Sequence, residues 1–404
     1  IARQAKLIGV HVNFAPVVDV NNNIKNPVIG NRSFGEDKEN VAQKGVAYMK
    51  GMQDNGLLAN AKHFPGHGDT DSDSHMTLPV INHNKERLDE IELYPFKKLI
   101  ENNVNSMMVA HLHIPAYDST PNKATTLSKN VVTDLLKEEL GFDGLIFTDA
   151  LNMKGVSDFY APGETDLLAF KAGNDVLLFP MDVPNAIKMI KDAIKKDELP
   201  EERLEESVKK ILHAKYKLGL HKGFKKLEVE NIHEELNSSE AKNLNEKLYA
   251  EAATLVKNEK GFIPIHILDT TNFASLSLRG SINSIFQQYL NKYADFTHYN
   301  LPKDNMDLGD YSQLMNQLSQ YETVVVGLHG MNNSASKRFG LKSEDLLFLQ
   351  NLSEQANVVL TVFGNAYSLK YLQSFQHVLM MYEDNEITQK LAPQMIFGAK
   401  PTKG

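Results

Sequence analysis

The sequence predicts an α/β protein that begins with a TIM-type (β/α)8 barrel. Short apolar runs alternate with helical runs along residues 1–180, and the apolar runs are almost continuous. Such runs are typical of a parallel sheet that is covered on both faces. A polar or charged side chain ends or follows most of them. Polar groups at one end of successive parallel strands are typical of the functional face of such a barrel.

Five strands are expected in this first part, at residues 12–19, 57–61, 106–114, 144–149 and 175–179. Helices are expected at residues 36–55, 87–102, 131–140, 183–196 and 201–218, and the first and third of these stop before a glycine. A closed barrel needs eight strands, so we expect about three βα units to precede Ile1. An open, doubly wound sheet of five strands is the alternative.

The chain is long enough for two domains. We expect a barrel domain over residues 1–222 that is incomplete at its N-terminal end. A polar linker is expected over residues 223–240. A second α/β domain is expected over residues 241–404, with an end that is not obviously complete. Its strands are expected at residues 273–278, 323–328, 358–363 and 378–382.

The composition excludes several classes of function. The net charge of −8 argues against a nucleic acid as the partner. The chain has no cysteine, which excludes disulfides and thiol chemistry. It also has no apolar run long enough to span a membrane. A globular protein that acts on a small molecule remains.

The loop over residues 62–79, KHFPGHGDTDSDSHMTLP, brings three histidines and three aspartates together on a short stretch of chain. Within it, Asp73 lies two residues before His75. A carboxylate that bonds an imidazole fixes its tautomer and keeps its pKa near neutral pH, as a general acid and base requires. A solvated polar loop is the alternative for such a short motif.

Other candidate residues lie at the ends of the expected strands. Asp149 could be a nucleophile or could cap the next helix. Lys62 and His63 could donate to substrate hydroxyls, although a regular strand would turn them to opposite faces. Arg32 lies in the loop after the first strand and could bind a ligand or be an ordinary surface arginine.

Two further interpretations concern histidines. His111 and His113 alternate on an expected strand, so one could line the pocket or be a core histidine. A zinc or two-metal site is also conceivable, but the spacing matches no compact metal motif. We therefore expect no metal and no cofactor. The candidate ligands would be His63, His67, Asp69, Asp73 and His75.

Several long motifs resemble the family-three glycoside hydrolases, and more narrowly their bacterial β-N-acetylglucosaminidase branch. These motifs are KHFPGHGDTDSDSHMTLP, NFAPVVDV, NRSFGED and FTDALNMKG. Three more segments, VKNEKGFIPI, VVVGLHG and QMIFGAKPTKG, are similar to the second domain of two-domain members. The resemblance implies a barrel followed by an α/β sandwich domain.

The resemblance also implies a role for each matching position. Asp149 matches the nucleophile that forms a covalent glycosyl-enzyme, so the anomeric configuration would be retained. His75 matches the general acid/base, and Asp73 is its hydrogen-bonded partner. Three positions match residues that bind the N-acetylglucosamine ring in the −1 subsite: Arg32, Lys62 and His63.

From these observations we expect an exo-acting, retaining β-N-acetylglucosaminidase. Its substrates would be peptidoglycan fragments or chitooligosaccharides that end in N-acetylglucosamine. A β-glucosidase, a xylosidase or an N-acetylglucosaminide phosphorylase of the same fold is the first alternative, and a metal-dependent hydrolase is the second. A sugar-binding protein without activity is disfavoured because the motif acids and bases are intact. The sequence fixes neither compartment nor oligomeric state, and the bacterial periplasm or cell envelope is favoured over the cytoplasm.

Overall fold

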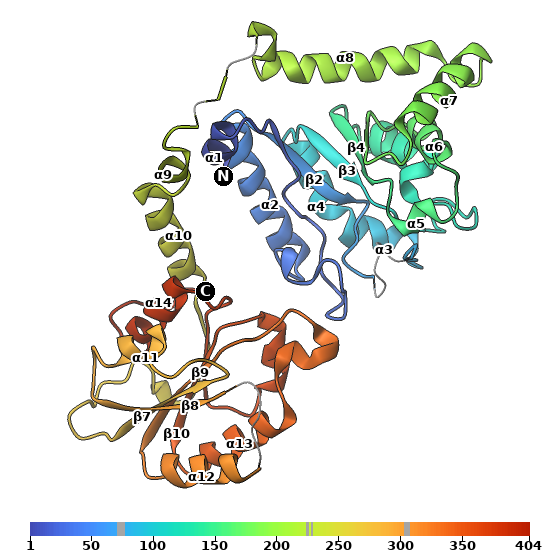
Figure 1. The fold of residues 1–404 in the computed structure, drawn as a ribbon. Helices are drawn as coiled ribbons and strands as arrows, with labels where there is room; N and C mark the ends of the chain where they lie inside the picture. The colour runs from blue at the N-terminus through green and yellow to red at the C-terminus, as the bar shows by residue number, and fades with distance from the viewer. Residues whose placement is uncertain (71–76, 224–225, 228, 303–307) are drawn as a thin grey trace. The chain divides into compact units, whose positions relative to one another are not determined.

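The computed structural model describes residues 1–70, 77–223, 226–227, 229–302 and 308–404. The chain divides into two compact units, Ile1–Leu236 and Asn237–Gly404 (Figure 1). Each unit contains one sheet with its own apolar core. The predicted α/β class is therefore confirmed for both parts of the chain.

The first unit holds a parallel five-stranded sheet whose strands follow one another in chain order. A doubly wound sheet reverses its order at a switch point, and this sheet does not. All carboxyl ends of these strands therefore lie along one edge. The strands are β1 (Val12–Asn13), β2 (Leu58–Phe64), β3 (Ser106–Val109), β4 (Leu145–Ala150) and β5 (Val176–Leu178).

Helices cover this sheet, and two of them, α2 (Lys38–Gln53) and α4 (Tyr94–Glu101), pack on each other and contribute to its core. Phe96 of α4 meets Phe64 of β2 edge to face, with ring centres 5.4 Å apart. The remaining helices are α1 (Ala2–Leu7), η1 (Gly30–Arg32), α3 (Lys85–Arg87), η2 (Leu88–Glu92), η3 (Thr125–Leu127), η4 (Asn130–Glu139), α5 (Lys154–Ser157), α6 (Glu164–Ala172), α7 (Val183–Lys195), α8 (Glu201–Lys217), η5 (Leu220–Lys222) and α9 (Ile232–Leu236).

Two expected strands are shorter than predicted. The strand expected at residues 12–19 stops after Asn13. Pro16 has no N–H to donate to a strand ladder. Its carbonyl oxygen accepts a hydrogen bond from the N–H of Lys62. The strand expected at residues 106–114 stops at Val109. Beyond it, the hydroxyls of Thr125 and Thr126 bind the carbonyl of Ala110, so side chains replace the strand ladder.

Residues 223–240 are less irregular than expected, because they contain α9. This helix packs on α1, and Nε2 of Gln4 donates to the carbonyl of Leu236 at 2.8 Å. The next helix, α10 (Ser239–Ala252), begins at Ser239 and opens the second unit. Where the structure describes the chain, none of its helices has the length and apolar character that crossing a bilayer requires.

The second unit holds a six-stranded sheet in the order β6-β11-β10-β9-β7-β8, in which only β6 runs antiparallel to its neighbour. Its strands are β6 (Thr254–Asn258), β7 (Phe273–Leu278), β8 (Phe296–Leu301), β9 (Thr323–Leu328), β10 (Asn357–Val362) and β11 (His377–Met380). Its helices after α10 are η6 (Glu259–Gly261), α11 (Ile285–Leu290), α12 (Leu308–Leu318), η7 (Ala335–Gly340), α13 (Ser343–Ser353), η8 (Ala366–Tyr371) and α14 (Glu386–Ile396).

Alternate residues of this second sheet pack into two separate apolar clusters. Val324 and Val326 of β9 join a cluster with Phe348 of α13. Val325, between them in the chain, joins the other cluster with Leu391 of α14. Since successive side chains of a strand point to opposite faces, helices cover both faces of this sheet.

The last long helix of the first unit, α8, is attached to the sheet by one buried carboxylate. Asp175, just before β5, accepts hydrogen bonds from the N–H of Ile146 at 3.0 Å and from the hydroxyl of Ser207 at 2.6 Å. The guanidinium of Arg203 lies 3.5 Å from the same carboxylate. Ser207 and Arg203 both belong to α8, so Asp175 joins this helix to β4 and β5.

We expect Asp175→Ala to destabilise the first unit by about 3–5 kcal/mol, because it removes the buried carboxylate that binds Arg203, Ser207 and the N–H of Ile146. Urea unfolding followed by circular dichroism would measure the loss. Glu205→Ala is the matched control, since it removes only an exposed ion pair with Lys209 on the same helix. It should change the unfolding free energy by less than about 1 kcal/mol. Equal effects of the two substitutions would contradict the proposed anchor.

Candidate active site

A buried aspartate, Asp19, lies at the centre of the polar cluster at the carboxyl edge of the first sheet. It follows the short β1 and has no solvent-accessible surface. The backbone N–H groups of His63 and His67 donate to its carboxylate at 3.2 and 2.7 Å. Nδ1 of His63 donates to it at 2.7 Å. One carboxylate therefore fixes both the end of β2 and the loop that leaves it.

The charges around Asp19 determine its protonation. Burial alone would raise the pKa of Asp19, but the charges of His63 and His67 and the hydrogen bonds from them lower it below its ordinary value of 3.8. His67 responds in the opposite way, because burial and the charge of His63 lower the pKa of His67 to about 4. Asp19 is therefore ionised and His67 is neutral at physiological pH.

Arg32 and Lys62 lie beside His63, as the sequence predicts for residues of one site. Nη2 of Arg32 is 3.3 Å from Nε2 of His63, and Nη1 donates to the carbonyl of Val28 at 3.1 Å. β2 is irregular here, since its register with β3 shifts between Ala61 and Phe64. Adjacent side chains are therefore not forced to opposite faces. Burial and the charge of Arg32 lower the pKa of Lys62, while Asp149 and Asp19 oppose that shift.

Asp149 lies near the carboxyl end of β4, among positive charges. Its Oδ1 accepts a hydrogen bond from the N–H of Ala150 at 2.8 Å. Burial alone would raise the pKa of Asp149, but the charges of His63, His111 and Lys62 and this hydrogen bond lower it overall. The carboxylate is therefore ionised at neutral pH, as a nucleophile must be.

The two histidines expected to alternate on one strand have separate surroundings, because β3 ends before them. His111 is fully buried, with Nδ1 2.7 Å from the hydroxyl of Thr126 and Nε2 3.0 Å from the carbonyl of Ala150. It therefore supports the backbone next to Asp149. His113 is only partly buried, and its Nδ1 lies 3.2 Å from the carbonyl of Lys123.

The predicted acid/base pair, Asp73 and His75, lies outside the described residues. The chain on both sides of it is held by hydrogen bonds. On one side, Nδ2 of Asn26 donates to the carbonyls of His67 and Gly68 at 2.8 and 3.1 Å. On the other side, the N–H of Ile81 donates to the carbonyl of His113 at 3.0 Å.

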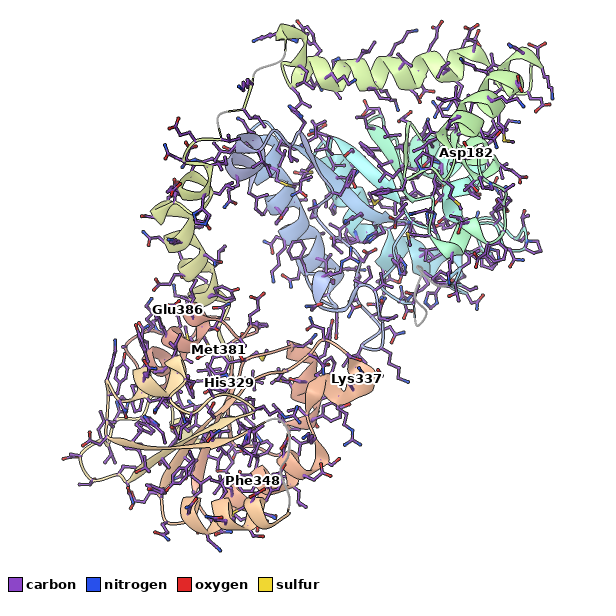
Figure 2. All side chains as sticks on the ribbon, viewed as in Figure 1. Asp182, His329, Lys337, Phe348, Met381 and Glu386 are labelled. Atoms are coloured by element: carbon purple, nitrogen blue, oxygen red, sulfur yellow. The ribbon has the colours of Figure 1, made fainter. Side chains whose placement is uncertain are left out.

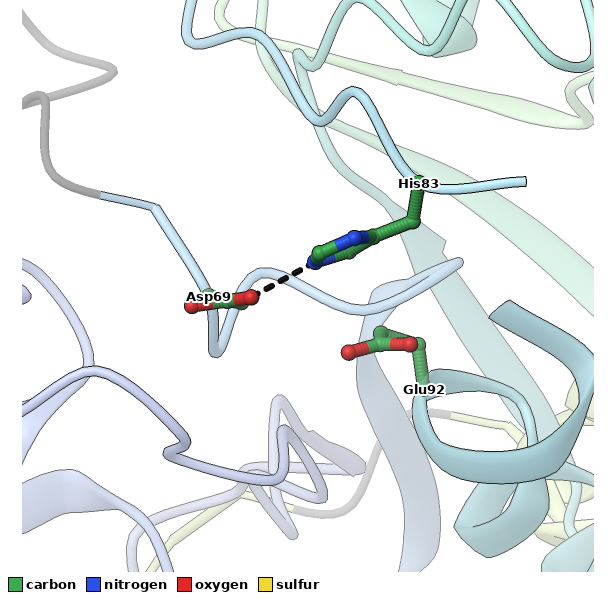
Figure 3. Close-up of side chains that lie close together, drawn as sticks. All are labelled: Asp69, His83 and Glu92. Carbon is green, nitrogen blue, oxygen red and sulfur yellow. Dashed lines mark hydrogen bonds and ion pairs between the residues drawn. The ribbon is translucent and has the colours of Figure 1, made fainter. Parts of the chain in front are cut away.

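The predicted set of metal ligands does not come together where it is described. Nδ1 of His63 binds Asp19, and Nδ1 of His67 is 2.9 Å from the hydroxyl of Thr70. Asp69 instead pairs with His83, 2.6 Å away (Figure 3). The described members of that set are therefore divided between separate clusters.

Two residues of the site are missing from the sequence-based prediction of catalytic and sugar-binding groups, namely Asp19 and His67. Asp19 ends an expected strand, but nothing in the sequence indicates its burial or the two histidines it binds. His67 lies inside the motif KHFPGHG, and its neighbours alone do not indicate its low pKa. The position of Asp19 at a strand end is the signal that could have identified it.

Acidic residues of the second unit are further candidates for a proton donor. Asp384 accepts from the N–H of Gly330 at 3.3 Å, and Nδ1 of His329 is 3.2 Å from its carboxylate. Glu386, which is labelled in Figure 2, pairs with Lys390, one turn along α14. These acids are engaged in bonds within their own unit.

The chain is an α/β protein whose first sheet is parallel and has its strands in chain order. Acidic and basic side chains gather along the carboxyl edge of this sheet, and together these features define its class. Residues 1–214 match the family model described as the glycosyl hydrolase family 3 N terminal domain. This match covers more than half of the chain, so the chain belongs to glycoside hydrolase family 3. The resemblance seen in the motifs is confirmed.

Relatives of the chain carry related names. Beta-hexosaminidase A of Pseudoalteromonas piscicida is 36% identical over 284 residues, which cover 66% of this chain and 47% of that protein. A protein of Cellulomonas fimi named beta-N-acetylglucosaminidase/beta-glucosidase is 32% identical over 273 residues, 66% of this chain and 48% of that protein. The chain thus spans about half the length of these relatives.

A solved structure supports the fold of the whole chain. The family 3 β-N-acetylglucosaminidase from Paenibacillus sp. str. FPU-7 superposes with a TM-score of 0.79 at 27% identity. The match covers 100% of this chain and 77% of that chain.

We expect Gly68→Ala to destabilise the first unit by about 1–3 kcal/mol or more, because the new Cβ would overpack the loop. That Cβ would lie 1.8 Å from the carbonyl oxygen of Val20, which is backbone and cannot rotate away. Urea unfolding would measure the loss. Gly51→Ala is the control: a Cβ there meets nothing within 4 Å, and the exposed site in α2 should gain about 0.5–1 kcal/mol.

The low pKa of His67 predicts a pH-dependent loss of stability. Below about pH 6.5 the unfolded chain binds a proton at this imidazole that the folded chain does not bind until about pH 4. The stabilisation is therefore complete above that range and is lost as the pH falls through it. In His67→Gln the free energy of unfolding should fall less between about pH 7 and pH 4.5 than in the wild type. Parallel pH profiles of the two proteins, measured by urea unfolding, would contradict the assignment.

Proposed function

We propose that this protein is a retaining exo-β-N-acetylglucosaminidase that removes terminal N-acetylglucosamine from peptidoglycan fragments or chitooligosaccharides. The observation that carries the proposal is Asp149, an ionised carboxylate at the carboxyl end of β4 among His63, His111 and Lys62. Membership of glycoside hydrolase family 3 and the names of the relatives support it.

In the proposed first step, Asp149 attacks the anomeric carbon and the bond to the leaving oxygen breaks. Because Oδ1 is held by the N–H of Ala150, Oδ2 is the oxygen that forms the glycosyl ester. The leaving oxygen takes its proton from His75, whose ring Asp73 orients. In the second step His75 removes a proton from water, which attacks the same carbon; the ester bond to Asp149 breaks, the carboxylate is released and the original configuration is restored.

Arg32, Lys62 and His63 are proposed to hold the hydroxyl groups of the sugar in the −1 subsite. The contact of Arg32 with His63 and the bond of His63 to Asp19 support this role, since a fixed donor array positions the anomeric carbon for attack. Neither a metal nor an organic cofactor takes part in the proposed reaction.

We also propose that the first sheet belongs to a TIM-type (β/α)8 barrel and that the second unit is an α/β sandwich domain. The sequential strand order supports the barrel, because consecutive strands of a barrel are neighbours. Two clusters on opposite faces of the second sheet support the sandwich. The domains are proposed at residues 1–222 and 241–404, joined by residues 223–240. The division of the structure at Leu236 falls between them.

A β-glucosidase activity is the second candidate. It is favoured by the relative from Cellulomonas fimi, whose name contains both activities. Rates on nitrophenyl N-acetylglucosaminide and on nitrophenyl glucoside would separate the two. The same assay with added phosphate tests for phosphorolysis, because a phosphorylase would release a sugar 1-phosphate.

Trapping the covalent intermediate is the most direct test. The full chain would be incubated with a fluorinated N-acetylglucosamine donor, digested, and analysed by mass spectrometry. The sugar should be found on the peptide that contains Asp149. A sugar on another carboxylate, or none on a protein that turns over the substrate, would contradict the proposed nucleophile.

We expect Asp149→Ala to lower kcat by about 1000-fold or more while the fold is kept, since alanine has no carboxylate to form the ester. Turnover of nitrophenyl N-acetylglucosaminide would measure it. Asp143→Ala is the matched control, because Asp143 is an exposed acid just before the same strand. Its kcat should match that of the wild type. Equal activity of the two variants would contradict the role of Asp149.

A further inference from the structure

Three metal-ligating side chains come together beside the cluster of Asp19 and Asp149, and none of them has a role in the proposed hydrolysis. They are Asp69, His83 and Glu92 (Figure 3). One ligand atom of each lies within 4.8 Å of the other two. Asp69 follows β2, His83 precedes α3, and Glu92 is the last residue of η2. The three side chains therefore come from three separate segments.

Each segment is held in place by contacts of its own. Asp69 follows Gly68, which packs against the backbone of Val20 and binds Asn26. His83 follows the segment in which Ile81 is bonded to the chain after β3. Glu92 lies inside the unit, with 1% of its surface exposed. A site built from fixed segments loses little conformational entropy when it binds an ion.

Other side chains orient the carboxylate of Glu92. Nη1 of Arg87 donates to its Oε2 at 2.5 Å, and Nδ2 of Asn22 donates to its Oε1 at 3.3 Å. Ligating carboxylates are commonly held by such outer hydrogen bonds. Arg87 balances one of the two carboxylates, so with a neutral His83 the group keeps one net negative charge. That charge favours a cation.

We propose that Asp69, His83 and Glu92 bind one divalent transition-metal ion, for which Zn²⁺ is the probe. The set offers one imidazole nitrogen, carboxylate oxygens and no sulfur, which suits zinc and its neighbours. Mg²⁺ and Ca²⁺ prefer ligands that are all oxygen. The ion would link residues 69 and 83 to η2, so its role is structural and does not depend on the proposed hydrolysis.

The metal must displace an existing hydrogen bond. Nε2 of His83 and Oδ2 of Asp69 are 2.6 Å apart. A bound ion would replace this bond with one bond from each of the two side chains to the metal.

The test uses the full chain, freed of metal with a chelator and titrated with Zn²⁺ by calorimetry. We expect about one ion per chain, a higher unfolding temperature with zinc, and little binding of Mg²⁺. His83→Ala should weaken binding more than about tenfold. Asp69→Asn keeps the shape of the side chain and removes its charge, so it provides a second variant if His83→Ala does not fold.

Two matched controls should bind zinc as the wild type does. Asp89→Asn removes an exposed acid from the same η2 helix, and His266→Ala removes an exposed imidazole from the second unit. Absence of zinc binding by the wild type would overturn the proposal. Equal affinity of His83→Ala and the wild type would overturn it too, and would leave Asp69 and His83 as an ion pair that only joins two segments.

Discussion

The first unit depends on the buried carboxylate of Asp19. A carboxylate without access to water is costly unless its oxygens are bonded, and here the donors are two backbone N–H groups and one imidazole. Two of them belong to His63 near the end of β2, and the third belongs to His67 in the loop that follows. The cost of burying Asp19 is thus offset only when this loop has one conformation, and that conformation places His63 next to Arg32. The hydrogen bonds to Asp19 therefore satisfy a buried carboxylate and also position the side chains of the candidate site.

The electrostatics of the site follow from this arrangement. Asp149 and Lys62 are both partly buried, and burial pushes the pKa of each toward the neutral form. The attraction between the two opposite charges opposes that shift. For Asp149, the charges of His63 and His111 also favour the ionised form and lower its pKa further. The carboxylate of Asp149 is therefore kept ionised by its basic neighbours, although it is partly buried.

The sequence predicts best the bounds of strands that are buried on both faces of a sheet. The bounds of β7 and β9 coincide with the predicted ones, because every residue in them is buried and the apolar run has clear ends. β8 was not predicted, since FTHYNL is a partly exposed edge strand with a mixed pattern. The motifs single out Asp149, Arg32, Lys62 and His63, and the catalytic and sugar-binding roles of these residues stay predictions. The hydrogen bonds of Asp19 could not be predicted, because its partners lie more than forty residues away along the chain.

Polar residues at strand ends do not by themselves identify a site, as the second sheet demonstrates. Arg279, after β7, donates through Nε and Nη2 to Asp345, whose other oxygen accepts from the hydroxyl of Tyr311. His329, after β9, pairs in the same way with Asp384. Both pairs are neutralised within the unit, so they stabilise the fold and leave no uncompensated charge for a substrate. In the first sheet, Asp149 has several basic neighbours but, among the described residues, no single partner that neutralises it. This difference in charge pairing separates the candidate active site from a structural ion-pair network.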